Sequence, residues 1–128
     1  METNKSWPHL LVSGFGCNPE ALNNLTLVYD FLKNLPSRIG MTALGPPVVY
    51  RVTPDVHEDT GVTGAIVIAT SHVTIHTFPE GQGEDLKKPF FTFDCFSCRA
   101  FDSDLVIQEL TAAFEPGDLR SEVIYRVN

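Results

Sequence analysis

The sequence predicts an α/β (α+β) two-layer sandwich, in which a mostly antiparallel sheet carries two helices packed on one face. Six apolar, extended segments are separated by short connections rich in Gly and Pro, a pattern typical of antiparallel strands. Two other segments place apolar residues at helical spacing, as helices that cover one sheet face do. With 128 residues and 43% hydrophobic content, we expect one domain over 1–128.

The first half of the chain opens with a strand and a helix. The strand is expected near 9–15, and the helix follows with Asn18 as its cap and Pro19 as its first residue. Pro36 is expected to end this helix, because proline cannot donate the next helical hydrogen bond. The apolar stripe that faces the sheet is expected to comprise Leu22, Leu25, Tyr29 and Leu32.

The rest of the chain supplies the remaining strands and one more helix. Four strands are expected near 42–52, 62–69, 73–78 and 90–97. The second helix is expected over 104–114, and Pro116 with Gly117 ends it. Its inward residues are expected to be Val106, Leu110, Ala113 and Phe114. A last strand over 122–127 completes the sheet.

Strand parity separates core residues from candidate chemical groups, because successive side chains point to opposite faces. Along 73–78, Val73 and Ile75 share the apolar face, and the other face carries the polar residues His72, Thr74 and His76. Along 90–97, one face carries Phe91, Phe93 and Cys95, and the other carries Thr92, Asp94 and Phe96, followed by Cys98. Cys95 is therefore expected in the core, and Cys98 at the polar end of its strand.

Charge and cysteine content exclude several classes of protein. The net charge is −7, the pI is near 4.9 and the basic residues are scattered, which disfavours nucleic-acid binding. No apolar run is long enough for a membrane helix, and no leader-like segment opens the chain. Three cysteines are an odd number, so a disulfide framework is not expected. These features predict a cytoplasmic protein without a membrane partner.

The segment from Thr70 to Glu80 has the composition of a self-processing site. Ser71 places a hydroxyl nucleophile at the end of the apolar segment 62–69, and His76 follows five residues later. A hydroxyl with a nearby base is the equipment needed to attack a neighbouring backbone carbonyl, which here is that of Thr70.

This segment resembles the core of the small prokaryotic S-adenosylmethionine decarboxylases. Their motif reads Glu-Ser-His-(Leu/Ile)-(Thr/Ser)-Ile-His-Thr-Trp-Pro-Glu and is followed by Asp-(Val/Leu)-Phe-Thr-Cys. The likeness extends to the opening segment from Trp7 to Leu22 and to 61–64, which is similar to the family's Gly-Val-Ser-Gly. It therefore covers nearly the whole chain and implies a homodimer with the sandwich fold described above.

The resemblance implies a role for each matched residue. The bond between Thr70 and Ser71 would break by an acyl shift and elimination, and Ser71 would become a pyruvoyl cofactor. That group forms a Schiff base with the substrate amine and takes up electrons as carbon dioxide leaves. His76 and Thr63 match the family's processing pair, Cys98 the proton donor and Glu80 the residue that holds the ribose of S-adenosylmethionine. The product would feed spermidine biosynthesis.

The chain also departs from the family pattern. Thr70 replaces a near-fixed glutamate before the serine, and Phe78 replaces the tryptophan of the motif. Val52 stands where the family has an aromatic residue that stacks on adenine, and the loop that follows, 53–60, is longer. The connection 81–89 is also longer than the family's tight turn.

Other functions remain open at this level. One alternative is a pyruvoyl-dependent decarboxylase of another amino acid, and another is an unprocessed homologue with a binding role. Cys95 and Cys98 with two histidines, His72 and His76, are enough in number for zinc, but parity argues against their convergence, and no metal is expected. A Cys-x-x-Cys redox pair and a Ser71–His76 hydrolase lack the expected local context.

Overall fold

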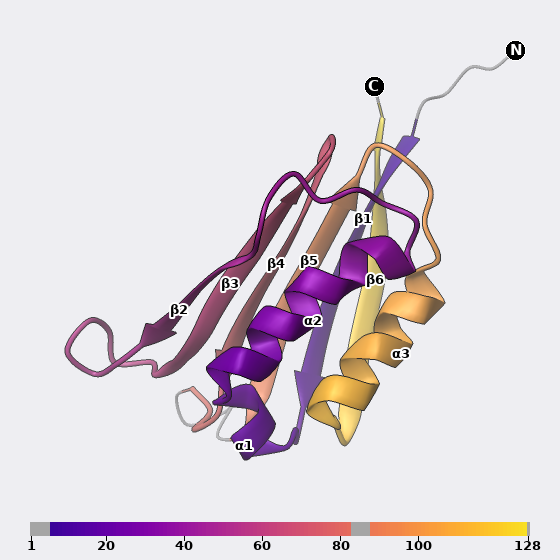
Figure 1. Ribbon diagram of the computed structural model, residues 1–128. Helices are drawn as coiled ribbons and strands as arrows, with labels where there is room; N and C mark the ends of the chain where they lie inside the picture. The colour runs from indigo at the N-terminus through magenta and orange to yellow at the C-terminus, as the bar shows by residue number, and fades with distance from the viewer. Residues whose placement is uncertain (1–5, 83–87, 128) are drawn as a thin grey trace, which may run out of the picture.

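The computed structural model describes residues 6–82 and 88–127, which form one antiparallel sheet with helices on a single face (Figure 1). Along the chain the elements are β1 (Ser6–Phe15), α1 (Pro19–Leu22), α2 (Leu25–Arg38), β2 (Val48–Val52), β3 (Gly61–Ile68), β4 (Ser71–Phe78), β5 (Phe90–Ser97), α3 (Ser103–Phe114) and β6 (Asp118–Val127). The six strands lie in the order β2-β3-β4-β5-β1-β6. The predicted two-layer fold is confirmed, and β4 and β5 are the two central strands of the sheet.

The first predicted helix is divided in two, because Asn24 restarts the helix. Its side-chain oxygen accepts a hydrogen bond from the backbone N–H of Leu27 at 3.0 Å, which is the geometry of an N-cap. The new phase buries Val28, Phe31, Leu32 and Leu35. The predicted stripe is therefore wrong at two positions, since Leu25 is exposed and Tyr29 is only partly buried.

Pro36 does not end the helix as predicted, because α2 continues to Arg38. Proline removes only one helical hydrogen bond, and it does so within the last turn, where few further bonds depend on it. Its own carbonyl accepts hydrogen bonds from the N–H groups of Ile39 and Met41, which close the helix end. Burial of the Pro36 ring against the core favours this arrangement.

The two largest differences between predicted and observed strand boundaries are at β2 and β6. The expected strand over 42–52 is reduced to β2, with an isolated bridge between Ala43 and Ile68, because Pro46 and Pro47 cannot donate ladder hydrogen bonds. The last strand is longer than expected, because β6 pairs with β1 along its whole length, from Ser6 opposite Val127 to Phe15 opposite Asp118.

The core lies between the sheet and the helices and is rich in phenylalanine. The ring of Phe114 on α3 lies 5.6 Å from Phe31 on α2 and 5.4 Å from Phe91 on β5, measured between centroids. Strand parity is confirmed, since Phe91, Phe93 and Cys95 are buried while the alternating residues face away from the helices. The sheet face opposite the helices, called the open face below, is not covered by any described element (Figure 1).

Two features hold the start of β3 against the end of β4. A Cβ atom at Gly61 would lie 1.9 Å from the carbonyl oxygen of Thr77, so glycine permits this close approach. The buried hydroxyl of Thr77 accepts a hydrogen bond from the N–H of Val62 at 2.9 Å and donates to the carbonyl of Leu22 at 2.7 Å. This hydroxyl therefore joins α1, β3 and β4.

No helix in the described part of the chain is long and apolar enough to cross a membrane.

We expect Thr77→Val to lower the free energy of unfolding by about 1–3 kcal/mol, because it leaves the N–H of Val62 and the carbonyl of Leu22 buried without this partner while preserving volume. Urea unfolding followed by circular dichroism measures the change. Thr111→Val on the exposed side of α3 is the matched control and should change stability by less than about 0.5 kcal/mol. Equal effects of the two substitutions would contradict the linking role of Thr77.

Candidate active site

Ser71 is the first residue of β4 and follows the short turn that connects β3 to β4. It lies opposite Ile68 on β3 and opposite Ser97 on β5. Its side chain is buried on the helix side of the sheet, on the same face as Val73. The predicted nucleophile is therefore held at a strand end, beside a tight turn, by pairing on both sides.

Thr70, the residue before Ser71, has a strained backbone. Its φ angle is +63°, in the left-handed region that β-branched residues rarely adopt. Such a conformation costs about 1–3 kcal/mol. Its hydroxyl donates to the carbonyl of Ala69 at 2.5 Å and lies 2.6 Å from Sγ of Cys98. The turn thus brings together three of the predicted site residues: Thr70, Ser71 and Cys98.

A cavity of about 200 Å³ opens beside this turn. Its walls come from the turn itself, from the segment 40–42 after α2, and from the end of β5. Arg99 lines it and contributes a positive charge, and its backbone N–H donates to the hydroxyl of Ser97 at 3.0 Å. A small polar group can therefore reach Ser71 from solvent.

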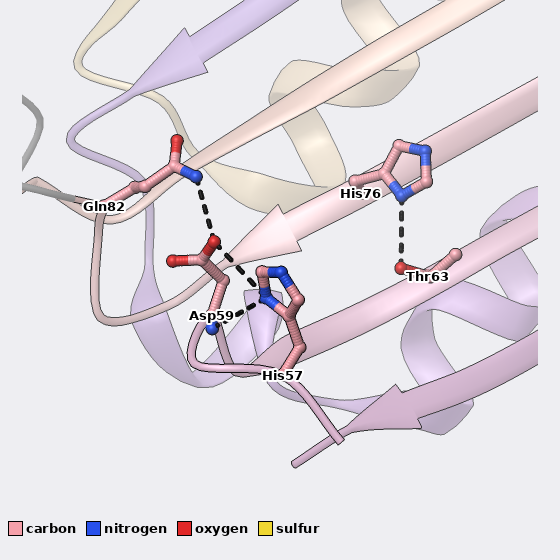
Figure 2. Close-up of polar contacts among 5 residues, drawn as sticks. All are labelled: His57, Asp59, Thr63, His76 and Gln82. Carbon is pink, nitrogen blue, oxygen red and sulfur yellow. Dashed lines mark hydrogen bonds and ion pairs between the residues drawn. The ribbon is translucent and has the colours of Figure 1, made fainter. Parts of the chain in front are cut away.

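Thr63 and His76 form a second group, at the opposite end of the same two strands. They are paired across β3 and β4, and Oγ1 of Thr63 lies 3.1 Å from Nδ1 of His76 (Figure 2). Both side chains point to the open face, as the predicted polar row requires. A hydroxyl that is hydrogen-bonded to an imidazole can exchange a proton with it, so the pair has the chemistry of an acid–base unit.

Ser71 and His76 cannot act on each other within one chain. They lie five residues apart on β4, which at the usual strand rise is about 16 Å. Their side chains also point to opposite faces of the sheet. This distance exceeds any hydrogen bond, so a Ser71–His76 hydrolase within a single chain is excluded. Glu80 is exposed and lies just beyond the His76 end of β4.

A larger cavity, of about 350 Å³, adjoins Thr63 and His76. Val52, Val56 and Phe78 give it apolar walls, and its polar lining includes His57, Asp59 and Gln82. The side-chain amide of Gln82 donates to Oδ2 of Asp59 at 2.9 Å and joins the loop 53–60 to the turn after β4 (Figure 2). Sequence reasoning did not predict a role for these three polar residues. The signal available was the unusual length of the two connections that carry them, 53–60 and 81–89.

The thiols of the chain differ in their surroundings. Burial raises the pKa of Cys17 to about 11, and burial together with the charge of Asp94 raises that of Cys95 to about 12. Both therefore remain protonated near neutral pH, and Cys95 lies in the core on the helix side, as predicted. Since His72 and His76 lie on the open face, Cys95 cannot share a zinc ion with them. Across the described ranges, no group of three or more His, Cys, Asp or Glu side chains is placed to hold a metal ion.

Comparison with known proteins identifies relatives over most of the chain. The family model described as S-adenosylmethionine decarboxylase matches residues 8–127. An S-adenosylmethionine decarboxylase proenzyme of Clostridium botulinum (strain Langeland) is 33% identical over 103 residues, which is 80% of this chain and 78% of the relative. The proenzyme of the same name from Thermodesulfovibrio yellowstonii is 32% identical over 110 residues, 84% of this chain and 70% of the relative.

A solved structure has the same fold. The crystal structure of the adenosylmethionine decarboxylase from Aquifex aeolicus superposes with a TM-score of 0.76 and covers 97% of this chain and 92% of its own. The sequences are 19% identical, so this likeness supports the architecture of the sheet and its helices.

Proposed function

Because this chain belongs to the S-adenosylmethionine decarboxylase family, we propose that it cleaves itself between Thr70 and Ser71 and that the processed protein decarboxylates S-adenosylmethionine. The observation that carries this proposal is the turn at Thr70, where a strained residue, a hydroxyl nucleophile and a thiol meet. The product, decarboxylated S-adenosylmethionine, would enter spermidine biosynthesis.

Self-cleavage follows from the chemistry of the turn. Oγ of Ser71 attacks the carbonyl carbon of Thr70, the C–N bond breaks, and an ester forms in place of the amide. Removal of the proton from the α-carbon of Ser71 then expels the ester oxygen, which ends the fragment 1–70 as a carboxylate. Addition of water and loss of ammonia leave the second fragment, 71–128, with a pyruvoyl group at its start.

The strain at Thr70 favours this reaction. The positive φ angle belongs to the residue whose carbonyl is attacked, and the turn holds it in that conformation before cleavage. Breaking the peptide bond releases the constraint, so about 1–3 kcal/mol of strain acts in the direction of cleavage. Because residue 70 contributes only its backbone carbonyl to the reaction, threonine would serve at this position in place of the glutamate of the family motif.

A pyruvoyl group at position 71 would supply a carbonyl that condenses with the substrate amine and accepts electrons as carbon dioxide leaves. Cys98 would return a proton to the substrate carbon, and the position of its sulfur beside the turn that carries position 71 supports this role. Arg99 and the 200 Å³ cavity give the substrate access to the same point. Glu80 is proposed to hold the ribose hydroxyls.

We further propose that the active protein is a homodimer with composite sites. His76 and Thr63 lie about 16 Å from Ser71 in the same chain, so as processing residues they must act on a second copy. The open face is suited to pair with another sheet, since it carries large exposed side chains such as Tyr50 (66% exposed) and Val67 (59% exposed).

Symmetry explains how the two groups would meet. A two-fold axis between two stacked open faces, running across the strands, reverses the strand direction in the partner. When β4 lies over the β4 of the second copy, the Ser71 end of one strand faces the His76 end of the other. Stacked sheets are about 10 Å apart. Because the Ser71 side chain points to the helix side, the group that the partner's His76 would approach is the backbone of Ser71 with its α-carbon proton. Each dimer would then contain two identical sites.

The two alternative functions are less well supported. A decarboxylase of another amino acid and an unprocessed binding protein are both disfavoured by relatives that carry the name S-adenosylmethionine decarboxylase proenzyme. The cytoplasm is the proposed location, because the three cysteines are free thiols, which suits a reducing compartment.

We expect Ser71→Ala to abolish both chain cleavage and the release of labelled carbon dioxide from carboxyl-labelled S-adenosylmethionine. The substitution removes the hydroxyl that attacks the carbonyl of Thr70 and so starts the conversion of residue 71 to a pyruvoyl group, whereas the backbone of β4 is unchanged. Ser121→Ala, on the exposed strand β6, is the matched control and should retain full activity. Carbon dioxide release by the Ser71→Ala protein would refute the pyruvoyl mechanism.

Composite sites predict complementation between inactive chains. Neither Ser71→Ala nor His76→Ala should cleave when expressed alone, because each lacks one half of every site. Co-expressed, the His76→Ala chain should be cleaved at Thr70, since its partner supplies His76. Electrophoresis of the mixed protein measures the fragments.

The control for complementation pairs His76→Ala with a Ser71→Ala, His76→Ala double variant. No copy of His76 is then present, and the chains should remain intact. If the first mixture also remained intact although mixed dimers formed, the composite site would be wrong.

A further inference from the structure

The 350 Å³ cavity contains a carboxylate that the chemistry described so far does not use. Asp59 lines this cavity from the loop 53–60, with its side chain only 16% exposed. Val52, Val56 and Phe78 contribute apolar surface to the same cavity. A carboxylate in such surroundings loses hydration and is stable only if a donor or a positive charge compensates.

The described residues compensate the negative charge of Asp59 only weakly. Gln82 donates one hydrogen bond to Oδ2 of Asp59 at 2.9 Å, but its amide is neutral. No lysine or arginine in the ranges 6–82 and 88–127 lies within ion-pair distance of this carboxylate. Asp59 is therefore a largely buried carboxylate without a lysine or arginine partner among these residues.

His57 does not neutralise the carboxylate in this arrangement. Its Nδ1 lies 3.5 Å from Oδ2 of Asp59, but the same nitrogen accepts a hydrogen bond from the backbone N–H of Asp59 at 3.1 Å (Figure 2). A ring nitrogen that accepts a hydrogen bond carries no proton, so it cannot donate to the carboxylate at the same time. The tautomer that satisfies this contact leaves the negative charge of Asp59 unpaired.

We infer that Asp59 is a specificity residue that binds the sulfonium cation of the substrate. This inference rests on the proposed function, because S-adenosylmethionine carries two positive groups and its amine is the one that reacts at position 71. The sulfonium keeps its charge throughout and has no N–H or O–H to donate. It is therefore recognised by a negative charge at contact distance within a partly apolar cavity, as Asp59 provides.

The place of the cavity agrees with this role. Thr63 and His76 line it together with Asp59, so it belongs to the end of β4 that the proposed dimer brings to the Ser71 of the second copy. A substrate whose amine reaches that position would lie along the cavity with its sulfur further from the reacting carbon. The long loop 53–60 follows Val52, which stands where the family has an adenine-stacking aromatic residue, and would then contribute charge recognition in place of stacking.

Two nucleosides that cannot react test the inference by binding alone. The first is 5′-deoxy-5′-dimethylsulfonioadenosine, which carries the sulfonium, and the second is 5′-deoxy-5′-methylthioadenosine, its neutral thioether. Isothermal titration calorimetry on the purified full-length protein gives both dissociation constants. We expect the wild type to bind the sulfonium at least about tenfold more tightly, as a charge pair of this exposure permits.

Asp59→Asn should reduce this preference to less than about twofold and leave the affinity for the thioether unchanged, since it removes the charge and keeps the shape. Asp59→Glu should restore much of the preference. Glu58→Gln, at the neighbouring exposed acid of the same loop, is the matched control and should retain it in full.

The outcomes separate this inference from the proposed function. A wild type that binds both nucleosides equally, or an Asp59→Asn protein that keeps the tenfold preference, would overturn the role of Asp59 while leaving adenosyl binding intact. A wild type that binds neither nucleoside would overturn the proposed substrate itself, and with it the role of Asp59.

Discussion

The antiparallel pairing of β3 with β4 fixes the place of each group on which the proposed chemistry depends. The pairing puts the strained turn at Thr70 at one end of the two strands and the pair of Thr63 and His76 at the other. A strand cannot shorten this distance, because its rise per residue is nearly constant. Under the proposed roles, the single sheet would therefore carry two half-sites, and a second copy of the chain would be needed to complete each site.

The fold could be predicted from sequence because apolar periodicity and turn residues agree along most of the chain. The predicted faces of β4 and β5 are correct, including the burial of Cys95, since strand parity leaves no freedom once the sheet has one buried face. The errors occur where a local side-chain contact competes with the pattern. Asn24 caps a new helix and shifts its phase, and Pro36 lies in a last turn that tolerates it.

The candidate site was less accessible to sequence reasoning. The motif groups Ser71, His76 and Cys98 as one predicted site, but a shared motif does not give proximity in space: Cys98 lies beside the Ser71 turn, and His76 does not. Asp59 and Gln82 could not be predicted, because they meet through two loops whose conformations follow no repeat. Such loops are where relatives with one fold come to differ in recognition.

Intact-mass spectrometry of the purified protein, with and without hydroxylamine, tests self-processing at Ser71 most directly. Two fragments covering 1–70 and 71–128 are expected, and the second should gain mass with hydroxylamine because its pyruvoyl carbonyl forms an oxime. A single chain of 14.2 kDa that stays intact on incubation and does not react with hydroxylamine would contradict it.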